Sequence, residues 1–298
     1  MARLDRAAVC HRVSDREQSE AAPHRQRLRV RYVDMARASL RKQCLSTVSE
    51  LCAILYLHTF DHFFWLSRRF RGGSPLPTSL RTHGVAYLGR LDKNSSSKLA
   101  GLISHRCESL VERRDGTDCR IWGLHQDDNF QCLLRDKFYK RALEPFGPRW
   151  QVANLMGNQV PNEIDSLGSG NGWHRDANSP QYKIMVLLSD VNSADDGAFA
   201  FIPKSHKMRY VLRTFNHRGK WRIDATRWSD TEISLGFPSP TLITGEAGDI
   251  FAFNGALLHR GLPNHGATAR IALTFYLFPK GKAPPHLPTG RSESEISP

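Results

Sequence analysis

Three features of the sequence predict a mainly β protein with flanking helices and a double-stranded β-helix (jelly roll, cupin-like) core. After residue 150 the apolar runs are short, and turns rich in Gly, Pro, Asn and Asp separate them. This half of the chain shows no long helical periodicity. In the run at 270–277, polar or small residues alternate with large apolar ones, as in a strand with one face toward a cavity and one toward covering helices. Together these features favour two packed antiparallel sheets.

The clearest linker signal is a cluster of Gly and Pro at 72–77, which divides the chain. We expect residues 1–72 to form a basic, partly disordered N-terminal arm with a helical extension, residues 73–282 to form the jelly-roll domain, and residues 283–298 to form a disordered tail. In the extension, apolar residues recur three or four positions apart over 33–70. Its apolar centre is too short to span a bilayer. We expect this helix to pack on the main domain, with an interfacial or partner-binding helix as the alternative.

Composition and charge limit the classes of protein. A chain of 298 residues with 40% hydrophobic residues can build one large domain with an N-terminal addition. The net charge is +13, and residues 1–78 hold 14 Lys and Arg against 7 Asp and Glu. A basic region of this kind can bind a peripheral membrane surface or another anionic partner, although a solvated basic surface is the favoured explanation. No zinc spacing or aromatic RNA-binding stretch predicts specific nucleic-acid recognition.

The cysteines and the first residues bear on the compartment. Six cysteines precede residue 133, and none forms a CxxC pair. This spacing argues against a zinc module and a disulfide scaffold. The first forty residues are rich in Arg but include acidic residues, and they lack the apolar centre of an export signal. We therefore expect reduced thiols, no transmembrane segment and a cytoplasmic protein.

The candidate metal ligands centre on the segment Trp173-His174-Arg175-Asp176. Side chains two apart in an extended strand point to the same face, so His174 and Asp176 would present an imidazole and a carboxylate side by side. A third ligand from a distant strand would complete a 2-His-1-carboxylate facial triad, which suits non-haem Fe(II). His259, 85 residues downstream, is the best candidate, and His265 is the alternative close to it.

Further segments make this pattern specific. They are the Trp-His-x-Asp segment at 173–176, the Ile-Pro-x-Ser-His-Lys segment at 202–207, the Gly-Asp strand that begins at 248 and the distal His259. With them, the region from about 150 to 279 resembles the phytanoyl-CoA dioxygenase-like family of Fe(II)/2-oxoglutarate-dependent oxygenases. The likeness is weak from about 78 to 149, where the stretch at 80–88, followed by a helix-like stretch at 97–113, is similar to the usual opening of the family, a helix and a strand before the barrel.

The resemblance implies Fe(II), 2-oxoglutarate and O2 as cofactors, with His174, Asp176 and His259 as metal ligands and catalytic residues. Arg270 lies 11 residues after His259, the offset at which the family places the arginine that grips the distal carboxylate of 2-oxoglutarate. A buried arginine also needs an anion on physical grounds, and an internal Asp is the alternative to the cosubstrate. Further candidate contacts to the cosubstrate come from Lys183, Thr274 and Asn154. Some members of the family have a hydroxyl residue where this chain has Gly261.

The predicted activity is hydroxylation of a C–H bond of a small-molecule or lipid-like substrate, with decarboxylation of 2-oxoglutarate to succinate. Since Asp176 is present, hydroxylation is favoured over halogenation. The segment at 207–240 combines aromatic and basic residues, which suits either a substrate loop for an anionic or amphipathic molecule or a simple cover for the barrel mouth. Two other classes stay open: a cupin-type metal-dependent isomerase that uses no 2-oxoglutarate, and a non-catalytic binding jelly roll.

Overall fold

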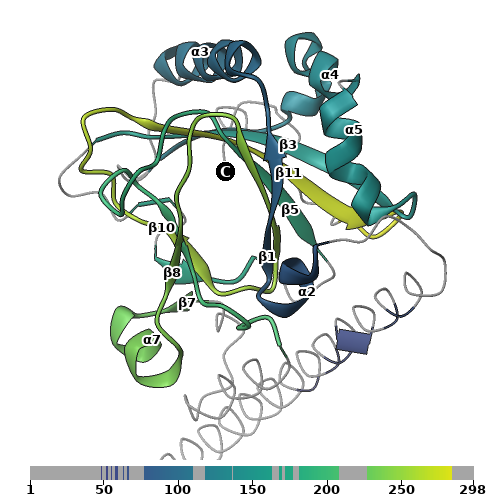
Figure 1. Cartoon of the computed structure of the whole chain (residues 1–298), viewed down its shortest axis with the longest axis vertical. Helices are drawn as coiled ribbons and strands as arrows, with labels where there is room; N and C mark the ends of the chain where they lie inside the picture. Colours follow the sequence, from purple (N-terminus) through teal and green to yellow (C-terminus); the bar gives the residue numbers. More distant parts are fainter. Residues whose placement is uncertain are drawn as a thin grey trace, which may run out of the picture. The chain divides into compact units, whose positions relative to one another are not determined.

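Figure 1 shows a computed structural model of the whole chain. The structure describes residues 77–109, 118–135, 137–162, 168–169, 172–176, 181–207 and 227–283, together with seven single residues between 48 and 66 that are all helical. The chain divides into two compact units, Met1–Ser49 and Glu50–Pro298, and every helix and strand named below belongs to the second. Four expectations fall wholly or mainly outside the described residues: the N-terminal arm, the linker, the C-terminal tail and the loop within 207–240.

Eleven strands within the described residues form two antiparallel sheets. The larger sheet contains, in spatial order, β1 (Val85–Arg90), β9 (Asp249–Asn254), β5 (Tyr182–Leu187), β11 (Arg270–Pro279), β3 (Trp150–Val160) and β2 (Cys119–Ile121). The smaller sheet contains β7 (Arg227–Trp228), β4 (Trp173–His174), β10 (His259–Gly261), β6 (Phe199–Phe201) and β8 (Thr241–Ile243). Strands that are distant in sequence are neighbours in both sheets. This arrangement confirms the predicted mainly β class with a jelly-roll core.

In the part of the chain that the structure describes from residue 77 onward, a few helices lie beside the sheets. They are α2 (Thr78–Thr82), α3 (Lys93–Ser109), α4 (Asp128–Arg135), α5 (Lys137–Leu143) and α7 (Asp230–Gly236), with two short 3-10 turns, η1 (Leu124–Gln126) and η2 (Glu144–Phe146). The helix predicted from residue 97 begins four residues earlier because Asp92 caps it, accepting a hydrogen bond of 2.9 Å from the backbone N–H of Ser95. Among the described residues, no helix has the length and apolar character needed to cross a membrane.

The two faces of β11 behave as its alternation predicts. Its apolar face, which includes Leu273 and Phe275, belongs to the main hydrophobic core together with Leu99 and Ile103 of α3. Figure 1 shows α3 lying over this outer side of the larger sheet. The opposite face lines a cavity between the sheets with Arg270, Ala272, Thr274 and Tyr276. The strand therefore separates the core from the cavity, and each face has the polarity of the side to which it points.

The space between the sheets is apolar where the cavity ends. Met185, Leu187 and Phe253 of the larger sheet pack there with Phe199, Phe201 and Ile243 of the smaller one. Met185, Phe199 and Phe253 of this apolar layer also line the cavity, so part of its wall is apolar.

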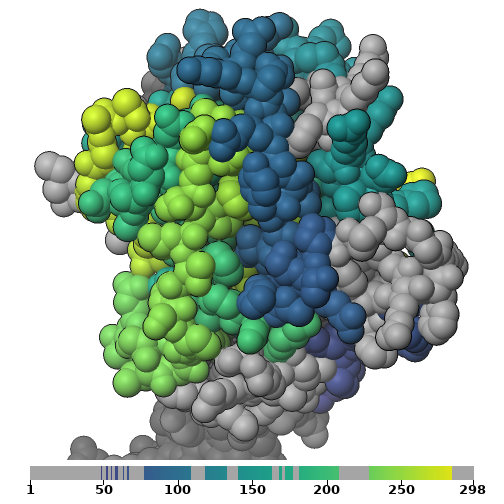
Figure 2. Space-filling view, in the orientation of Figure 1, coloured from purple at the N-terminus to yellow at the C-terminus, as the bar shows by residue number. Residues whose placement is uncertain are grey.

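One edge of the larger sheet is formed by β1, which pairs with β9. Figure 2 shows this blue segment running along the front of the molecule beside green residues of the later half of the chain.

Candidate metal centre

Strand pairing brings the three predicted metal ligands together. In the smaller sheet, β4 pairs with β10 so that His174 lies directly opposite His259. Asp176 follows β4 by two residues, and its backbone N–H donates to the carbonyl of Gly255 at 3.1 Å. One ligand atom from each of the three side chains lies within 4.8 Å of the other two. No other group of three metal-binding side chains is found among the described residues, and the exposed His265 is not part of this one.

Both histidines are oriented by backbone carbonyls. The Nδ1 of His174 lies 2.8 Å from the carbonyl oxygen of Gly172, and the Nδ1 of His259 lies 2.8 Å from that of Leu257. When Nδ1 donates to a carbonyl, Nε2 is left as the lone-pair atom, which is the form that binds a metal. Burial lowers the pKa of His259 to about 3, so its ring is neutral at ordinary pH. Phe199 stacks on that ring at 5.0 Å between centroids and fixes its plane.

The carboxylate of Asp176 is placed to accept a cation. Its Oδ2 lies 3.3 Å from Nε2 of His259 and is buried without a hydrogen-bond partner, whereas Oδ1 lies 2.7 Å from Nζ of Lys183. Burial alone would raise the pKa of Asp176, but the Lys183 ammonium and the two imidazoles hold that pKa well below its usual range. A buried, ionised oxygen with no donor is costly unless a cation binds it. The side chains present therefore fit a metal ion held by two nitrogens and one oxygen.

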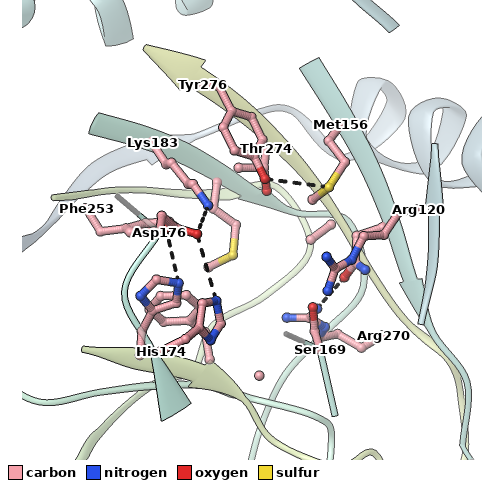
Figure 3. Close-up of a pocket in the computed structure, with 16 residues that line it drawn as sticks. Arg120, Met156, Ser169, His174, Asp176, Lys183, Phe253, Arg270, Thr274 and Tyr276 are labelled. Atoms are coloured by element: carbon pink, nitrogen blue, oxygen red, sulfur yellow. Dashed lines mark hydrogen bonds and ion pairs between the residues drawn. The ribbon is translucent and has the colours of Figure 1, made fainter. Parts of the chain in front are cut away.

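A second polar cluster lies on the other side of the cavity, as Figure 3 shows. Arg270 is buried, donates from Nη2 to Oδ1 of Asn158, and has no partner for its Nε. Burial lowers the pKa of Arg270 to about 10, which leaves it charged at neutral pH. The carboxylate of Asp118 accepts hydrogen bonds from Nε of Arg120 and from Oγ of Ser169, both at 2.8 Å. Two arginines against one aspartate leave a net positive charge, which suits the carboxylate of a ligand.

A sequence profile of the phytanoyl-CoA dioxygenase (PhyH) family matches residues 114–272, more than half of the chain. The chain belongs to the phytanoyl-CoA dioxygenase family. The matched residues include the metal triad and Arg270, and the chain is a non-haem iron enzyme that depends on 2-oxoglutarate. A search of curated proteins found no match.

Solved structures share the fold of this phytanoyl-CoA dioxygenase family member. HygX from Streptomyces hygroscopicus, with nickel and 2-oxoglutarate bound, is 19% identical, and the match covers 70% of this chain and 89% of that chain with a TM-score of 0.51. The epimerase SnoN from nogalamycin biosynthesis, described as non-haem and α-ketoglutarate-dependent, is 15% identical over 68% and 79% with a TM-score of 0.54. AviO1 from Streptomyces viridochromogenes Tue57 is 16% identical over 70% and 95% with a TM-score of 0.51. At these identities the likeness is one of fold.

The Ile-Pro-x-Ser-His-Lys segment of this family member ties the ligand-bearing strands together. Ser205 Oγ accepts a hydrogen bond of 2.8 Å from the backbone N–H of Leu258, the residue before His259. Arg175, which separates the other two ligands in sequence, donates to the carbonyls of Ser205 and Ala256. One buried guanidinium thus connects the segment that carries His174 and Asp176 with the two turns beside β10. The motif positions the metal site without contributing a ligand.

His206 in the same segment contacts the backbone of α2 and is not part of the metal triad. Its Nε2 lies 3.2 Å from the carbonyl oxygen of Arg81, and its Nδ1 is buried without a hydrogen-bond partner. Desolvation is the main cause that lowers the pKa of His206 to about 3. This value lies below the pKa of about 6.5 of a histidine in an unfolded chain. Unfolding therefore takes up a proton between about pH 6.5 and pH 3.

Replacing His206 with Gln should flatten the acid side of the stability profile. When the pKa of a group is lower in the folded state than in the unfolded state, its full contribution to the free energy of unfolding is present above the unfolded-state pKa. This contribution is lost as the pH falls from the unfolded-state pKa to the folded-state pKa. One proton corresponds to a slope of about 1.4 kcal/mol per pH unit. We expect the free energy of unfolding to rise with pH more steeply in the metal-free wild type than in His206→Gln, by roughly that amount. Denaturant unfolding at several pH values measures both slopes. The exposed His265→Gln is the control. Equal slopes in all three proteins would contradict the buried neutral imidazole.

The predicted cosubstrate contacts separate into two groups. Lys183 and Thr274 line the cavity, whereas Asn154 is not among the lining residues, and its Oδ1 accepts hydrogen bonds from the backbone of Gly123 and Leu155. The sequence analysis did not identify four further residues that line the cavity. They are Arg120, Met156, Asn158 and Ser169. Met156 and Asn158 lie two residues apart on β3, so the alternation of side chains along a strand could have identified them. Arg120 and Ser169 lie in stretches whose sequence shows no clear helix or strand pattern.

Gly261 departs from the family members that have a hydroxyl residue two positions after the distal histidine, and the structure gives the reason. A Cβ at Gly261 would lie 2.6 Å from Cβ of Ser169 and 3.0 Å from its backbone nitrogen. The backbone N–H of Gly261 also donates to the carbonyl of Ser169 at 2.9 Å. The backbone at Ser169 therefore takes the place that a side chain at residue 261 would need. A hydroxyl group still lines this part of the cavity, but it belongs to Ser169.

We therefore expect Gly261→Ser to destabilise the protein even though it restores the residue type of those relatives. Overpacking of this kind costs about 1–3 kcal/mol. Thermal or denaturant unfolding measures it, with Gly101→Ser as a matched control, because a Cβ at Gly101 meets nothing within 4 Å. A Gly261→Ser protein as stable as the wild type would show that Ser169 does not occupy this space.

Proposed function

We propose that the enzyme hydroxylates a C–H bond of a small-molecule or lipid-like substrate and converts 2-oxoglutarate to succinate and CO2. The observation that carries this proposal is the pairing of an intact triad with a buried arginine cluster across one cavity. One atom of O2 enters the substrate as its new hydroxyl group, and the other enters succinate. The substrate loses two electrons, and the decarboxylation of the keto acid supplies the other two that reduction of O2 requires.

The protein's own residues have distinct tasks in this reaction. His174, Asp176 and His259 would hold Fe(II), and three adjacent positions would remain for other ligands. Arg270, supported by Asn158, would bind the distal carboxylate of 2-oxoglutarate through charge-assisted hydrogen bonds. Bound together, iron and the keto acid activate O2 for attack on a C–H bond. Thr274 lines the cavity from the same face of β11 and would add a contact to the cosubstrate.

The apolar lining protects this chemistry from water. Met185, Phe199 and Phe253 all line the cavity, and the last two pack ring to ring at 4.8 Å. Displacing water strengthens every charged contact in the site and limits side reactions of the activated oxygen. A dry, shaped cavity around a fixed ligand set is the main contribution of the protein to this kind of catalysis.

The proposed substrate class rests on the composition of the segment at 207–240. This segment is rich in basic and aromatic residues, and we propose that it receives an anionic or amphipathic molecule. SnoN is an epimerase, so the same fold also serves an outcome without a new hydroxyl group. The product must therefore be measured directly.

The test is succinate formation from 2-oxoglutarate under 18O2 with a panel of acyl thioesters, fatty acids and polar small molecules. We expect one substrate class to stimulate succinate formation and to gain one labelled oxygen atom. His259→Ala should abolish both signals, and the exposed His265→Ala should retain them. Stimulated succinate formation with an isomerised, unlabelled product would replace hydroxylation by epimerisation. A wild-type protein that binds metal but forms no succinate would favour the cupin-type isomerase or the binding jelly roll.

A further inference from the structure

Lys183 is a buried charge for which the proposed reaction assigns no clear task. It lies on β5 between β9 and β11, where its register partners are Phe253 and Tyr276. Its Nζ lies 4.4 Å from the centroid of the Tyr276 ring and 5.7 Å from that of Phe253. Two aromatic faces therefore hold the ammonium in place while its charge is directed to Asp176. Burying the charge of a lysine costs free energy of desolvation, which indicates that Lys183 has a role in the site.

The position of Lys183 separates it from the arginine cluster. Figure 3 shows Lys183 beside Asp176 and His174 on one side of the cavity, and Arg120, Arg270 and Ser169 on the other. A cosubstrate that reached from the metal toward Arg270 would extend away from Lys183. The lysine is thus placed to act on the metal ligand itself.

The two oxygens of Asp176 have different environments. Oδ1 forms the 2.7 Å ion pair with Lys183 and lies 3.8 Å from Nε2 of His174. Oδ2 has no hydrogen-bond partner and lies 3.3 Å from Nε2 of His259. One oxygen is therefore occupied by a cation of the protein, and the other is left for a cation from solution.

We propose that Lys183 is a positioning residue that holds Asp176 as a one-oxygen ligand, with its ammonium occupying Oδ1 so that only Oδ2 binds the metal. The inference rests on the proposed function, because it requires a metal in the triad. A carboxylate can bind a metal through one oxygen or through both. Two-oxygen binding would consume one of the three open positions, of which the keto acid needs two and O2 needs the third. Lys183 thereby keeps the site open.

This role has a signature that a merely structural role lacks. An ammonium close to a divalent cation repels it, so the direct effect of the lysine charge on metal affinity is unfavourable. Lys183→Met should therefore bind Co(II) at least as tightly as the wild type does. The same variant should bind 2-oxoglutarate more weakly by about tenfold or more, because the second carboxylate oxygen competes for a position at the metal. The two affinities move in opposite directions.

The test uses Co(II), whose visible absorption reports the number of ligands, in the full-length protein without O2. Before 2-oxoglutarate is added, wild type and the exposed Lys98→Met control should give the same bands. Lys183→Met should give shifted bands, because the second carboxylate oxygen of Asp176 would replace a water ligand at one of the open positions. Lys183→Arg, which keeps the charge, should retain the wild-type spectrum. If Lys183→Met does not fold, Lys183→Gln takes its place in the same comparison.

Three outcomes would overturn the inference. One is a Lys183→Met protein with the wild-type Co(II) spectrum and unchanged affinity for 2-oxoglutarate. Another is weaker Co(II) binding together with lower stability, which would make Lys183 a structural residue. The third is an unchanged Co(II) spectrum with weaker cosubstrate binding, the behaviour expected of Arg270→Leu, which would make Lys183 a direct cosubstrate contact. A wild-type protein that binds no Co(II) at the triad would refute the proposed function itself, and the inference with it.

Discussion

Asp176→Ala is expected to abolish turnover of 2-oxoglutarate and to weaken metal binding by more than about 100-fold. The variant loses the only anionic protein ligand of the triad. It also leaves the ammonium of Lys183 without its carboxylate, so the site changes from attracting a cation to repelling one. Metal affinity is measured by competition with a chromophoric chelator, and turnover by succinate formation. Wild-type turnover in this variant would refute the triad.

The same substitution should destabilise the metal-free protein, since removing one partner of a buried ion pair costs about 3–5 kcal/mol. A paired variant separates this effect from the loss of the ligand. Asp176→Ala combined with Lys183→Met removes both charges and should recover most of the free energy of unfolding, but it should not recover metal binding. Recovery of both would mean that Asp176 acts only through folding.

Arg270→Leu should raise the apparent dissociation constant for 2-oxoglutarate by about 10- to 100-fold, because a charge-assisted contact contributes about 1.5–3 kcal/mol. Metal affinity should be unchanged, since Arg270 lies across the cavity from the triad. Arg141→Leu, on the exposed side of α5, is the matched control. The measurement is a titration of the metal-loaded protein with 2-oxoglutarate. An unchanged cosubstrate dependence would move the anchor to Arg120 or Lys183.

The candidate metal triad could be predicted from the sequence because two of its three residues lie close together in the chain. His174 and Asp176 are two residues apart. Their side chains lie close together although β4 ends at His174, because the backbone N–H of Asp176 is hydrogen-bonded to the carbonyl of Gly255. The alternation along β11 was equally readable, because each face of a strand takes the polarity of its surroundings. The family motifs then selected His259 over His265, a choice that spacing alone leaves open.

The anionic-ligand side of the cavity was less predictable because it depends on register. Asn154 and Asn158 lie on the same face of β3, but Asn158 pairs with Ala272 near Arg270, and Asn154 pairs with Tyr276 farther along. Alternation reports the face and not the distance along the strand. Arg120 reaches the cavity only because β2, three residues long, adds to the edge of β3. No periodicity over three residues can signal such a strand.

We propose that His174, Asp176 and His259 form an open iron site that faces an anchor for 2-oxoglutarate. The most direct measurement is the visible spectrum of the anaerobic protein with Fe(II) as 2-oxoglutarate is added. A keto acid bound through two oxygens to ferrous iron gives a metal-to-ligand charge-transfer band, so the wild type should develop this band. Zn(II) protein should not, His259→Ala should lose it, and His265→Ala should keep it. An iron-loaded wild type that develops no band, or a band lost in His265→Ala and kept in His259→Ala, would contradict the account.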